Sequence, residues 1–406
     1  MEKSRKPKIR FKGFTADWEQ RKLGELASSF EYGLNAASKS YDGINKYIRI
    51  TDIDDETRTF LDTDLTSPDC DLSLSENYLL KDGDILFART GASVGKTFIY
   101  KAFNGVVYYA GFLIRARLKE NCSPQFVFYN TLTKEYEKFI RVTSQRSGQP
   151  GVNAHEYATF ELRLPKYDEQ CEIGKFFTNL DHLITLHQRK LDKLINVKKS
   201  MLEKMFPKQG STVPEIRFNG FTQAWEQREF DEVFVEKRDK TERENEDTLL
   251  SCAINGIYLN SELFGHFRGA TTIGYLKVNK NDLILSAQNL HLGNANVNLR
   301  FEHGIISPAY KVYNLADCDP YFVHSWVKKD STKNFFLRAT TEGASQCRKN
   351  IEWHTLEKQT ILMPVIREQN MIGNYFKALD DLITLHQRKL EKLKNIKKSM
   401  LEKMFI

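Results

Sequence analysis

The sequence contains no long apolar run. None of its apolar stretches reaches the roughly 18–20 residues that a membrane-spanning helix requires. The first residues, Met1 to Lys6, are mostly charged and have no apolar region behind them, so we expect no secretory signal. The chain is therefore predicted to work in the cytoplasm and away from membranes.

Cysteine is sparse and widely scattered. The chain has six cysteines, and no two of them lie closer than 29 residues in the sequence. Zinc sites usually need cysteines a few residues apart, and disulfide-stapled proteins need a higher density of them. We therefore expect reduced thiols, with no metal site in this chain.

Charge of one sign is in only mild excess. Lys and Arg number 60 and Asp and Glu number 53, which gives a net charge of +7 over 406 residues. This excess permits a nucleic-acid partner without demanding one. The length predicts two to three domains, and an apolar fraction of 41% excludes a disordered chain.

What the chain does contain is an internal repeat. The stretch Leu183–Leu191 recurs letter for letter as Leu382–Leu390, and the similarity continues to Phe206 and Phe405. An upstream motif at residues 7–21, here called the leading motif, recurs at 214–228 with the pattern Pro-x-Ile-Arg-Phe-x-Gly-Phe-Thr-x-x-Trp-Glu-Gln-Arg. Such a repeat indicates that one framework was used twice.

The repeat sets the predicted domain boundaries. Two domains, 1–164 and 214–363, are each followed by a closing segment, at 165–206 and 364–406. Residues 207–213, which contain Pro, Gly and Ser, form a short linker between the halves. The middle parts of the two domains hardly resemble each other, so the framework is predicted to hold two different inserts.

The closing segments are predicted to be long helices. Residues 169–206 contain no proline, and apolar residues recur there at spacings of three and four, as they do in the copy. The predicted seam consists of Ile173, Phe177, Leu180, Ile184, Leu191 and Leu194, and of Ile372, Phe376, Leu379, Ile383, Leu390 and Leu393. Two further seam positions are polar in both copies, which often fixes register: His187/His386 and Lys198/Lys397. An antiparallel pair is the most economical arrangement, and two unrelated interfaces are the alternative.

Both inserts are predicted to mix strands and helices. Strand patterns occur at 46–50, 84–88, 97–100 and 112–116 and near 283–285 and 310–313, and helical patterns occur at 125–141 and 320–338. The predicted fold class is α+β, with two globular mixed α/β domains joined by two long antiparallel coiled-coil helices in a pseudo-twofold internal repeat.

No catalytic centre is visible. Gly91 to Thr97 resembles a phosphate-binding P-loop but has three residues between its glycines where that motif has four. Ser307-Pro308-Ala309-Tyr310 resembles a motif of amino-methyltransferases but lacks its second proline. We therefore predict no catalytic residue and no cofactor in this chain.

Polar loops follow equivalent strands and helices in the two inserts. Arg and Lys can bind guanine edges, Asn and Gln adenine edges, and Ser and Thr phosphates. Taken singly, each loop could be ordinary surface, but their occurrence at equivalent places with different letters fits two different base sequences. The predicted DNA-binding residues are Arg89, Thr90, Ser93, Lys96, Gln145, Arg146, Ser147, Gln149, Ser286, Gln288, Asn289, His291, Ser345, Gln346, Arg348 and Lys349.

Taken together, these features resemble the DNA-specificity (S) subunit of type I restriction–modification enzymes. The resemblance rests on the duplicated leading motif, on Gly83-Asp84-Ile85-Leu86-Phe87-Ala88-Arg89-Thr90-Gly91 followed by Gly95-Lys96, and on the long-helix endings. The second insert departs from the pattern, with Ala287-Gln288-Asn289 where the first has Arg89-Thr90-Gly91.

The resemblance implies a division of labour within a larger complex. Two target-recognition domains each bind one half of a split, asymmetric site in double-stranded DNA, and the helices set their spacing. Two methyltransferase (modification) subunits dock on the chain, and restriction/translocase subunits join them. S-adenosylmethionine, ATP and Mg are expected in those partner subunits and not in this chain.

Two other functions stay open from the sequence. One is a bivalent scaffold that binds proteins through its inserts, and the other, which the failed motifs argue against, is a self-contained nuclease or methyltransferase. The net charge bears on the DNA hypothesis, because residues 189–206 carry +4 and residues 388–406 carry +5, which leaves the rest of the chain at −2. We therefore predict that the chain alone binds DNA poorly and that the assembled complex binds it well.

Overall fold

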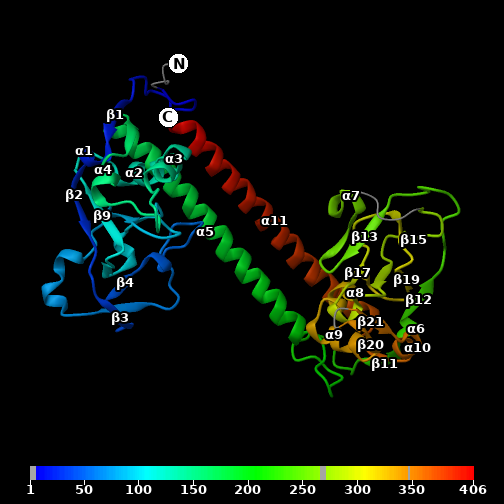
Figure 1. The fold of residues 1–406 in the computed structure, drawn as a ribbon. Helices are drawn as coiled ribbons and strands as arrows, with labels where there is room; N and C mark the ends of the chain where they lie inside the picture. Colours follow the sequence, from blue (N-terminus) through cyan, green and yellow to red (C-terminus); the bar gives the residue numbers. More distant parts are fainter. Residues whose placement is uncertain (1–5, 266–270, 346–347) are drawn as a thin grey trace. The chain divides into compact units, whose positions relative to one another are not determined.

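Two long helices formed by the closing segments organise the structure (Figure 1). In the computed structural model, which describes residues 6–265, 271–345 and 348–406, α5 covers Tyr167–Lys204 and α11 covers Ile366–Met404. The chain divides into two compact units. Unit 1 comprises the described residues up to Gln188 together with Arg388–Ile406, and unit 2 comprises Arg189–Gln387. The predicted domains 1–164 and 214–363 each fall in one unit, whereas each long helix is shared between the two.

Unit 1 is built on a four-stranded sheet in the order β2-β9-β6-β7, in which all neighbours are antiparallel. The strands of this unit are β1 Glu19–Lys22, β2 Ala27–Tyr32, β3 Ala37–Ser40, β4 Lys46–Ile48, β5 Thr66–Asp69, β6 Ile85–Ala88, β7 Thr97–Ile99, β8 Val107–Tyr109, β9 Leu113–Leu118 and β10 Glu161–Leu164. Its short helices are α1 Leu23–Leu26, α2 Pro124–Asn130, α3 Lys134–Thr143 and α4 Ala154–Ala158. The leading motif enters as β1, which pairs with β10 just before α5 begins.

Unit 2 has a sheet of the same order, β12-β19-β16-β17, although its sequence differs. Its strands are β11 Glu226–Glu229, β12 Phe234–Lys237, β13 Leu250–Ala253, β14 Gly256–Leu259, β15 Leu276–Asn279, β16 Leu283–Ser286, β17 Ala295–Val297, β18 His303–Ile306, β19 Tyr310–Leu315, β20 Thr340–Ser345, β21 Arg348–Ile351 and β22 Thr360–Met363. Its short helices are α6 Phe230–Val233, α7 Asn260–Leu263, α8 Pro320–Val327, α9 Asp330–Leu337 and α10 Trp353–Glu357. The two inserts therefore share a sheet topology, although their amino-acid sequences hardly resemble each other.

The predicted single helix at 125–141 is wrong, because the chain breaks it into α2 and α3. Thr131 and Thr133 turn their hydroxyls back to the carbonyls of Phe128 and Asn130, and Thr133 also caps the first turn of α3. Hydroxyl side chains compete in this way with helix propagation and favour caps. The helix predicted at 320–338 is divided in the same way into α8 and α9, with a break at Lys328 and Lys329.

Within each unit, the end of one long helix packs against the beginning of the other. In unit 1, Lys397 of α11 pairs with Asp181 of α5 at 2.6 Å, and the Phe405 ring lies 5.8 Å from the Phe177 ring. From the Phe177–Phe405 contact to the Asp181–Lys397 contact, residue numbers rise along α5 and fall along α11, so the two segments run antiparallel. Unit 2 repeats the arrangement with the Lys198–Asp380 ion pair and with Phe206 6.2 Å from Phe376.

The predicted seam residues lie inward on both helices. Ten of them are buried and two are half-buried: Ile173, Phe177, Leu180, Ile184, Leu191, Leu194, Ile372, Phe376, Leu379 and Leu390 are the buried ones, and Ile383 and Leu393 are the half-buried ones. The polar seam positions Lys198 and Lys397 are used for the two ion pairs between helices. An ion pair at one position of an apolar seam favours one register over its neighbours. None of the helices among the described residues has the length and apolarity to cross a membrane.

Candidate nucleic-acid interface

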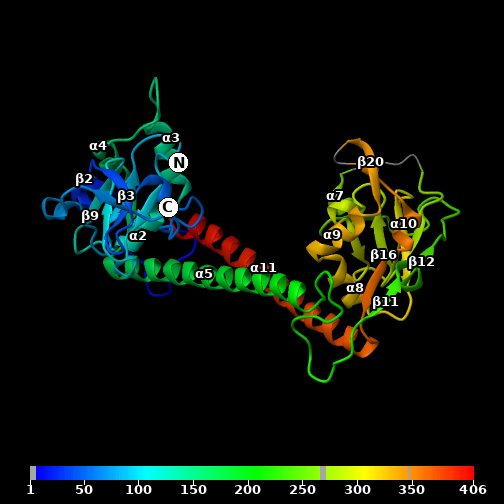
Figure 2. The ribbon, with the colours of Figure 1, turned by 90° about the horizontal axis from the view of Figure 1, so that it is seen from below.

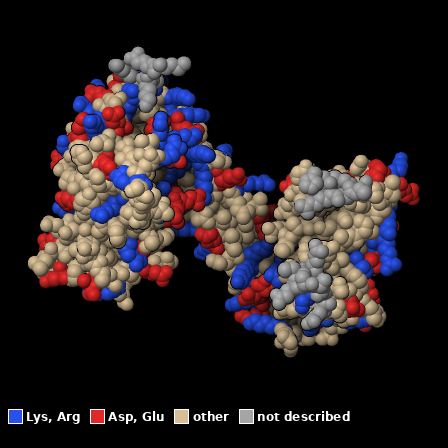
Figure 3. Space-filling view, in the orientation of Figure 1, with Lys and Arg blue, Asp and Glu red and all other residues tan. Residues whose placement is uncertain are grey.

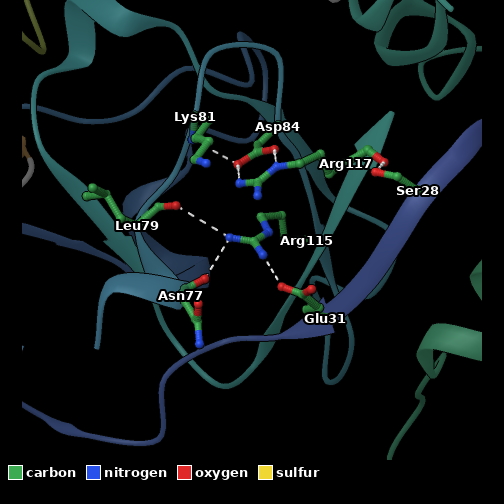
Figure 4. Close-up of polar contacts among 8 residues, drawn as sticks. All are labelled: Ser28, Glu31, Asn77, Leu79, Lys81, Asp84, Arg115 and Arg117. Carbon is green, nitrogen blue, oxygen red and sulfur yellow. Dashed lines mark hydrogen bonds and ion pairs between the residues drawn. The ribbon is translucent and has the colours of Figure 1, made fainter. Parts of the chain in front are cut away.

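The sheet of unit 1 is held by buried charge pairs at the base of β6 (Figure 4). Arg117 donates two hydrogen bonds to Asp84, at 2.8 and 2.7 Å, and the Lys81 amide donates a third at 2.8 Å. The neighbouring Arg115 donates to the carbonyls of Asn77 and Leu79 and to the carboxylate of Glu31. Asp84 is 2% exposed. The bidentate Arg117–Asp84 pair has a fixed geometry, so it holds the start of β6 against β9.

The two polar loops predicted for unit 1 meet beyond the end of β6. The Gly91 amide donates to the Pro150 carbonyl at 3.0 Å, Thr90 is bridged to Gly151, and the Val152 amide donates to the Arg89 carbonyl at 2.9 Å. Residues far apart in sequence therefore form one surface. The segment between α3 and α4, which carries Gln145–Gln149, projects from the body of unit 1 (Figure 2).

The predicted residues of unit 1 are placed differently from one another. Gln145, Arg146, Ser147 and Gln149 are exposed, and the Arg146 side chain pairs with Glu156. Arg89 stacks its guanidinium 5.0 Å from the centre of the Tyr32 ring, and among the described residues no carboxylate forms an ion pair with it. Arg146 also donates to the carbonyls of Thr143 and Gln145, so it is engaged within unit 1. The Gln145, Ser147 and Gln149 side chains keep hydrogen-bonding capacity for an outside partner.

Lys96 lies inside the unit. It is 6% exposed and donates to the carbonyls of Ile53 and Ile50, while Asp55 pairs with its ammonium group. These groups tie the polar loop to residues 50–55. The contact of Lys96 with DNA stays a prediction, and the structure assigns its ammonium group to the interior. Ser93, in the same loop, is half-buried.

In unit 2, one charge from the second predicted loop acts on the first. Lys349, which lies on β21, is close enough for its charge to lower the pKa of His291, although burial of the imidazole is the larger cause. β20 and β21 are antiparallel neighbours, with Thr340 opposite Ile351. Gln346 and the side chains of Ser345 and Arg348 lie outside the described residues.

The loop after β16 is more enclosed than predicted. Ser286 is buried and accepts a hydrogen bond from the Asn289 amide at 3.3 Å, whereas Gln288 is exposed and Asn289 half-buried. His291, in the short turn Leu290–Leu292, is 9% exposed, and neither ring nitrogen has a hydrogen-bond partner among the described residues. Of the predicted DNA-binding groups in this loop, those that face solvent are therefore Gln288 and part of Asn289.

A cleft of about 970 Å³, lined by both basic and acidic side chains, adjoins the first loop in unit 1. Ser93, Arg58, Lys394 and Lys398 are among the residues that line it. Lys394 pairs with Glu56, but no carboxylate among the described residues forms an ion pair with Arg58 or Lys398. Arg58 also adopts φ 59°, a conformation that non-glycine residues rarely hold without a reason. The basic part of α11 thus faces this cleft, and Figure 3 shows Lys and Arg gathered where α11 ends in unit 1.

Unit 2 has a smaller cleft of about 670 Å³ against the basic end of α5. Lys198, Lys199, Lys208, Lys328 and Lys329 are among its lining residues. Burial lowers the pKa of Lys328 and that of Lys329 to about 8. Part of the charge of the two helix ends, Lys199 in unit 2 and Lys398 in unit 1, therefore lines a cleft within each unit, where it suits phosphate groups.

Sequence reasoning missed Tyr32 and Phe112. Residues 112–116 were predicted to form a strand, but β9 begins at Leu113 and Phe112 lies in the preceding turn with its side chain 62% exposed. The glycine at position 111 was the available signal for that turn. Among the described residues, no cluster of His, Cys, Asp and Glu could hold a metal ion.

Comparison with known proteins supports one family. Residues 15–196 match the family model described as "Type I restriction modification DNA specificity domain". The chain is similar to the MjaX type I restriction enzyme specificity subunit of Methanocaldococcus jannaschii, with 24% identity over 411 residues, 95% of this chain and 92% of the relative. It is also similar to the MjaVIII specificity subunit of the same organism, with 21% identity over 348 residues, 80% of this chain and 79% of the relative.

One solved structure supports the fold. It is the type I restriction–modification S subunit from M. genitalium, with a TM-score of 0.59, 13% identity and coverage of 99% of both chains. These similarities confirm the resemblance drawn from the leading motif and the repeated helices.

Proposed function

We propose that this chain, a type I restriction–modification specificity subunit, recognises a bipartite, asymmetric site in double-stranded DNA, with one unit for each half-site. The observation that carries the proposal is the meeting of two polar loops beyond the end of β6 in unit 1, with the polar loop after β16 at the same place in a sheet of the same order in unit 2. Recognition of two different half-sites requires different residues at equivalent positions of the two units. The cleft that includes Ser93 and Lys398 in unit 1 suits the phosphates that flank a half-site.

The long helices act in this proposal as a ruler. The half-sites then lie roughly one duplex turn apart, centre to centre, because both grooves must face the same side of the duplex. Shortening α5 and α11 by the same whole number of turns is expected to shorten the spacer of the recognised site while leaving both half-sites unchanged. An unchanged spacer would contradict the ruler.

The outer faces of the helices suit the docking of two modification subunits. Leu183 and Leu186 on α5 are 46% and 47% exposed, and Leu382 and Leu385 on α11 are 42% and 44% exposed. They lie off the seam, and each pair offers a partner an apolar stripe. S-adenosylmethionine, ATP and Mg belong to the modification and restriction subunits in this scheme, and this chain supplies the recognition of DNA and the surface on which those subunits dock.

Exchange of one insert tests the proposal. Residues 27–160 are replaced by the corresponding segment of another specificity subunit, the chain is assembled with its modification subunits, and methylated sites are sequenced. We expect one half-site to change and the other to stay. A change in both halves would reject separate recognition by the two units. The absence of any DNA motif from the wild-type complex would favour a protein-binding scaffold instead.

A further inference from the structure

Phe112 displays an aromatic ring on a rigid turn. Its side chain is 62% exposed, and the turn is closed by a hydrogen bond from the Leu113 amide to the Ala110 carbonyl at 2.9 Å. The Gly33 amide donates to the Leu113 carbonyl at 3.0 Å, which ties the turn to the chain beside it. A Cβ at Gly33 would lie 2.1 Å from the Ala110 oxygen, so only glycine allows this approach. The backbone beneath the ring is therefore fixed.

The ring stands beside the candidate interface. The Phe112 carbonyl accepts a hydrogen bond from the Arg89 amide at 3.1 Å, directly where β6 ends. Arg89 carries its guanidinium over Tyr32, and the next residues, Thr90 and Gly91, contact Pro150 and Gly151. An exposed aromatic ring thus adjoins a cation and the two polar loops, which together offer stacking and hydrogen bonding on one surface.

Unit 2 contains the same turn without the ring. The Ala287 amide donates to the Ala309 carbonyl at 3.1 Å, and the Tyr310 amide closes the turn on the Ser307 carbonyl at 3.1 Å. Ala309 therefore corresponds to Phe112, and Ala287 corresponds to Arg89. Since the turn forms with alanine in unit 2, its geometry does not require an aromatic side chain. Exposing the ring to water gives no hydrophobic stabilisation either, because that comes from burial.

We propose that Phe112 is a specificity-determining residue of unit 1 and makes an apolar contact with a base of its half-site. Two parts of DNA offer this chemistry: the methyl group of thymine at the edge of the major groove, and the face of a base that has been partly unstacked. Arg89 would hold a neighbouring base edge or phosphate. This inference rests on the proposed function and deepens it, because at this turn unit 1 would contact DNA through an aromatic ring that unit 2 lacks.

The test uses the full chain assembled with its modification subunits and a pool of random duplexes. Bound duplexes are selected and sequenced for the wild type, for Phe112→Ala and for Phe103→Ala. Phe103 is a matched control, because it is another phenylalanine of unit 1, is 87% exposed and lies in the short turn 102–104. That turn follows the end of β7, which pairs with the start of β6, whereas Phe112 lies beside the end of β6. Ala309→Phe, the reverse exchange at the equivalent turn, is the fourth protein.

We expect Phe112→Ala to bind the wild-type consensus duplex about 5- to 150-fold more weakly, the range measured when a stacking aromatic is removed. Sequence preference is expected to relax at one position of the half-site assigned to unit 1, while the other half-site stays as it was. Phe103→Ala is expected to match the wild type, and Ala309→Phe is expected to alter the unit 2 half-site only.

Two probes separate the two sources of the contact. If the ring touches a thymine methyl, replacing that thymidine with deoxyuridine weakens the wild type but not Phe112→Ala. If the ring stacks on an unstacked base, 2-aminopurine at that position brightens on binding to the wild type but not to Phe112→Ala. Phe112→Leu keeps an apolar side chain but has no ring. It is therefore expected to keep the sensitivity to deoxyuridine and to lose the 2-aminopurine signal.

Selection by Phe112→Ala of the wild-type motif with affinity within twofold would overturn the inference. Equal loss at both half-sites, or loss in Phe103→Ala as well, would also overturn it. These outcomes differ from failure of the proposed function, in which the wild-type complex itself would select no motif.

Discussion

The first prediction concerns the buried ion pair that holds the leading motif on α5. Arg10 donates from Nε to Oε1 and from Nη2 to Oε2 of Glu169, both at 2.6 Å, and Glu169 is 1% exposed. This hydrogen-bonding raises the pKa of Arg10. The change is Glu169→Gln, which keeps the shape of the side chain and removes its charge. It leaves the Arg10 guanidinium beside a neutral amide in a largely buried place.

The magnitude follows from the burial. Removing one partner of a buried ion pair costs about 3–5 kcal/mol, because the other charge stays desolvated. The glutamine oxygen still accepts one of the two hydrogen bonds, so we expect the lower end, about 3 kcal/mol. For a unit of this size each kcal/mol lowers Tm by about 2–4 °C, so the melting of unit 1 is expected to move down by about 6–12 °C.

Calorimetry and hydrogen exchange measure this effect. The Ile9 amide, which donates to the Lys403 carbonyl at 3.0 Å, is expected to exchange faster in Glu169→Gln. Glu172→Gln is the control, because that carboxylate is exposed on the next turn of α5. Unit 2 repeats the pair, with Arg217 donating twice to Glu368 at 2.7 Å, so Glu368→Gln is expected to act on unit 2. A Tm shift below about 2 °C in both glutamine variants would refute the reasoning.

Three further predictions follow from single side chains. Burial lowers the pKa of His324 from 6.5 to about 3, so the unfolded state takes up a proton first as the pH falls, and unit 2 should lose stability from pH 6.5 to 3. His324→Phe introduces the residue that unit 1 has at the equivalent position, Phe128. In acid titrations followed by circular dichroism, this variant should lack that pH dependence of stability. Asp84→Asn should destabilise unit 1 by about 3 kcal/mol in urea titrations, since Arg117 would lose its buried counter-charge, and an unchanged midpoint would contradict this. Lys398→Gln should lower the dependence of log Kd on log salt by about one without changing the selected motif, and an altered motif would count against a phosphate contact.

The long helices and the main strands could be predicted because their patterns continue over many residues. Seam positions from Ile173 to Leu194 repeat through several turns, so one unusual residue does not hide the period. The break between α2 and α3 was missed because the apolar face continues across it, while two threonine hydroxyls decide the backbone locally. A hydrophobic pattern is not sensitive to such competition.

The candidate interface was predicted only in part, since its geometry depends on contacts distant in sequence. Lys96 looks like a loop cation in the sequence, but it is enclosed by carbonyls of residues 50–53, more than 40 positions away. Phe112 looks like a strand residue, but Gly33 and the turn at Ala110 leave its ring outside. Residue type predicted which groups can bind DNA, whereas tertiary packing decides which of them face it.

The hydrogen bonds of the leading motifs close the two units over very different distances along the chain. Ile216 donates to the Lys204 carbonyl, 12 residues earlier, whereas Ile9 donates to the Lys403 carbonyl, 394 residues later. Met404 and Phe405, 2% and 6% exposed, belong to the same apolar core as Trp18 and Phe126. Unit 2 can therefore complete its core from one continuous stretch, Arg189–Gln387, whereas unit 1 needs two distant segments to meet. Closing so long a loop costs more entropy, and until it closes the aromatic core of unit 1 is open to chaperones and proteases.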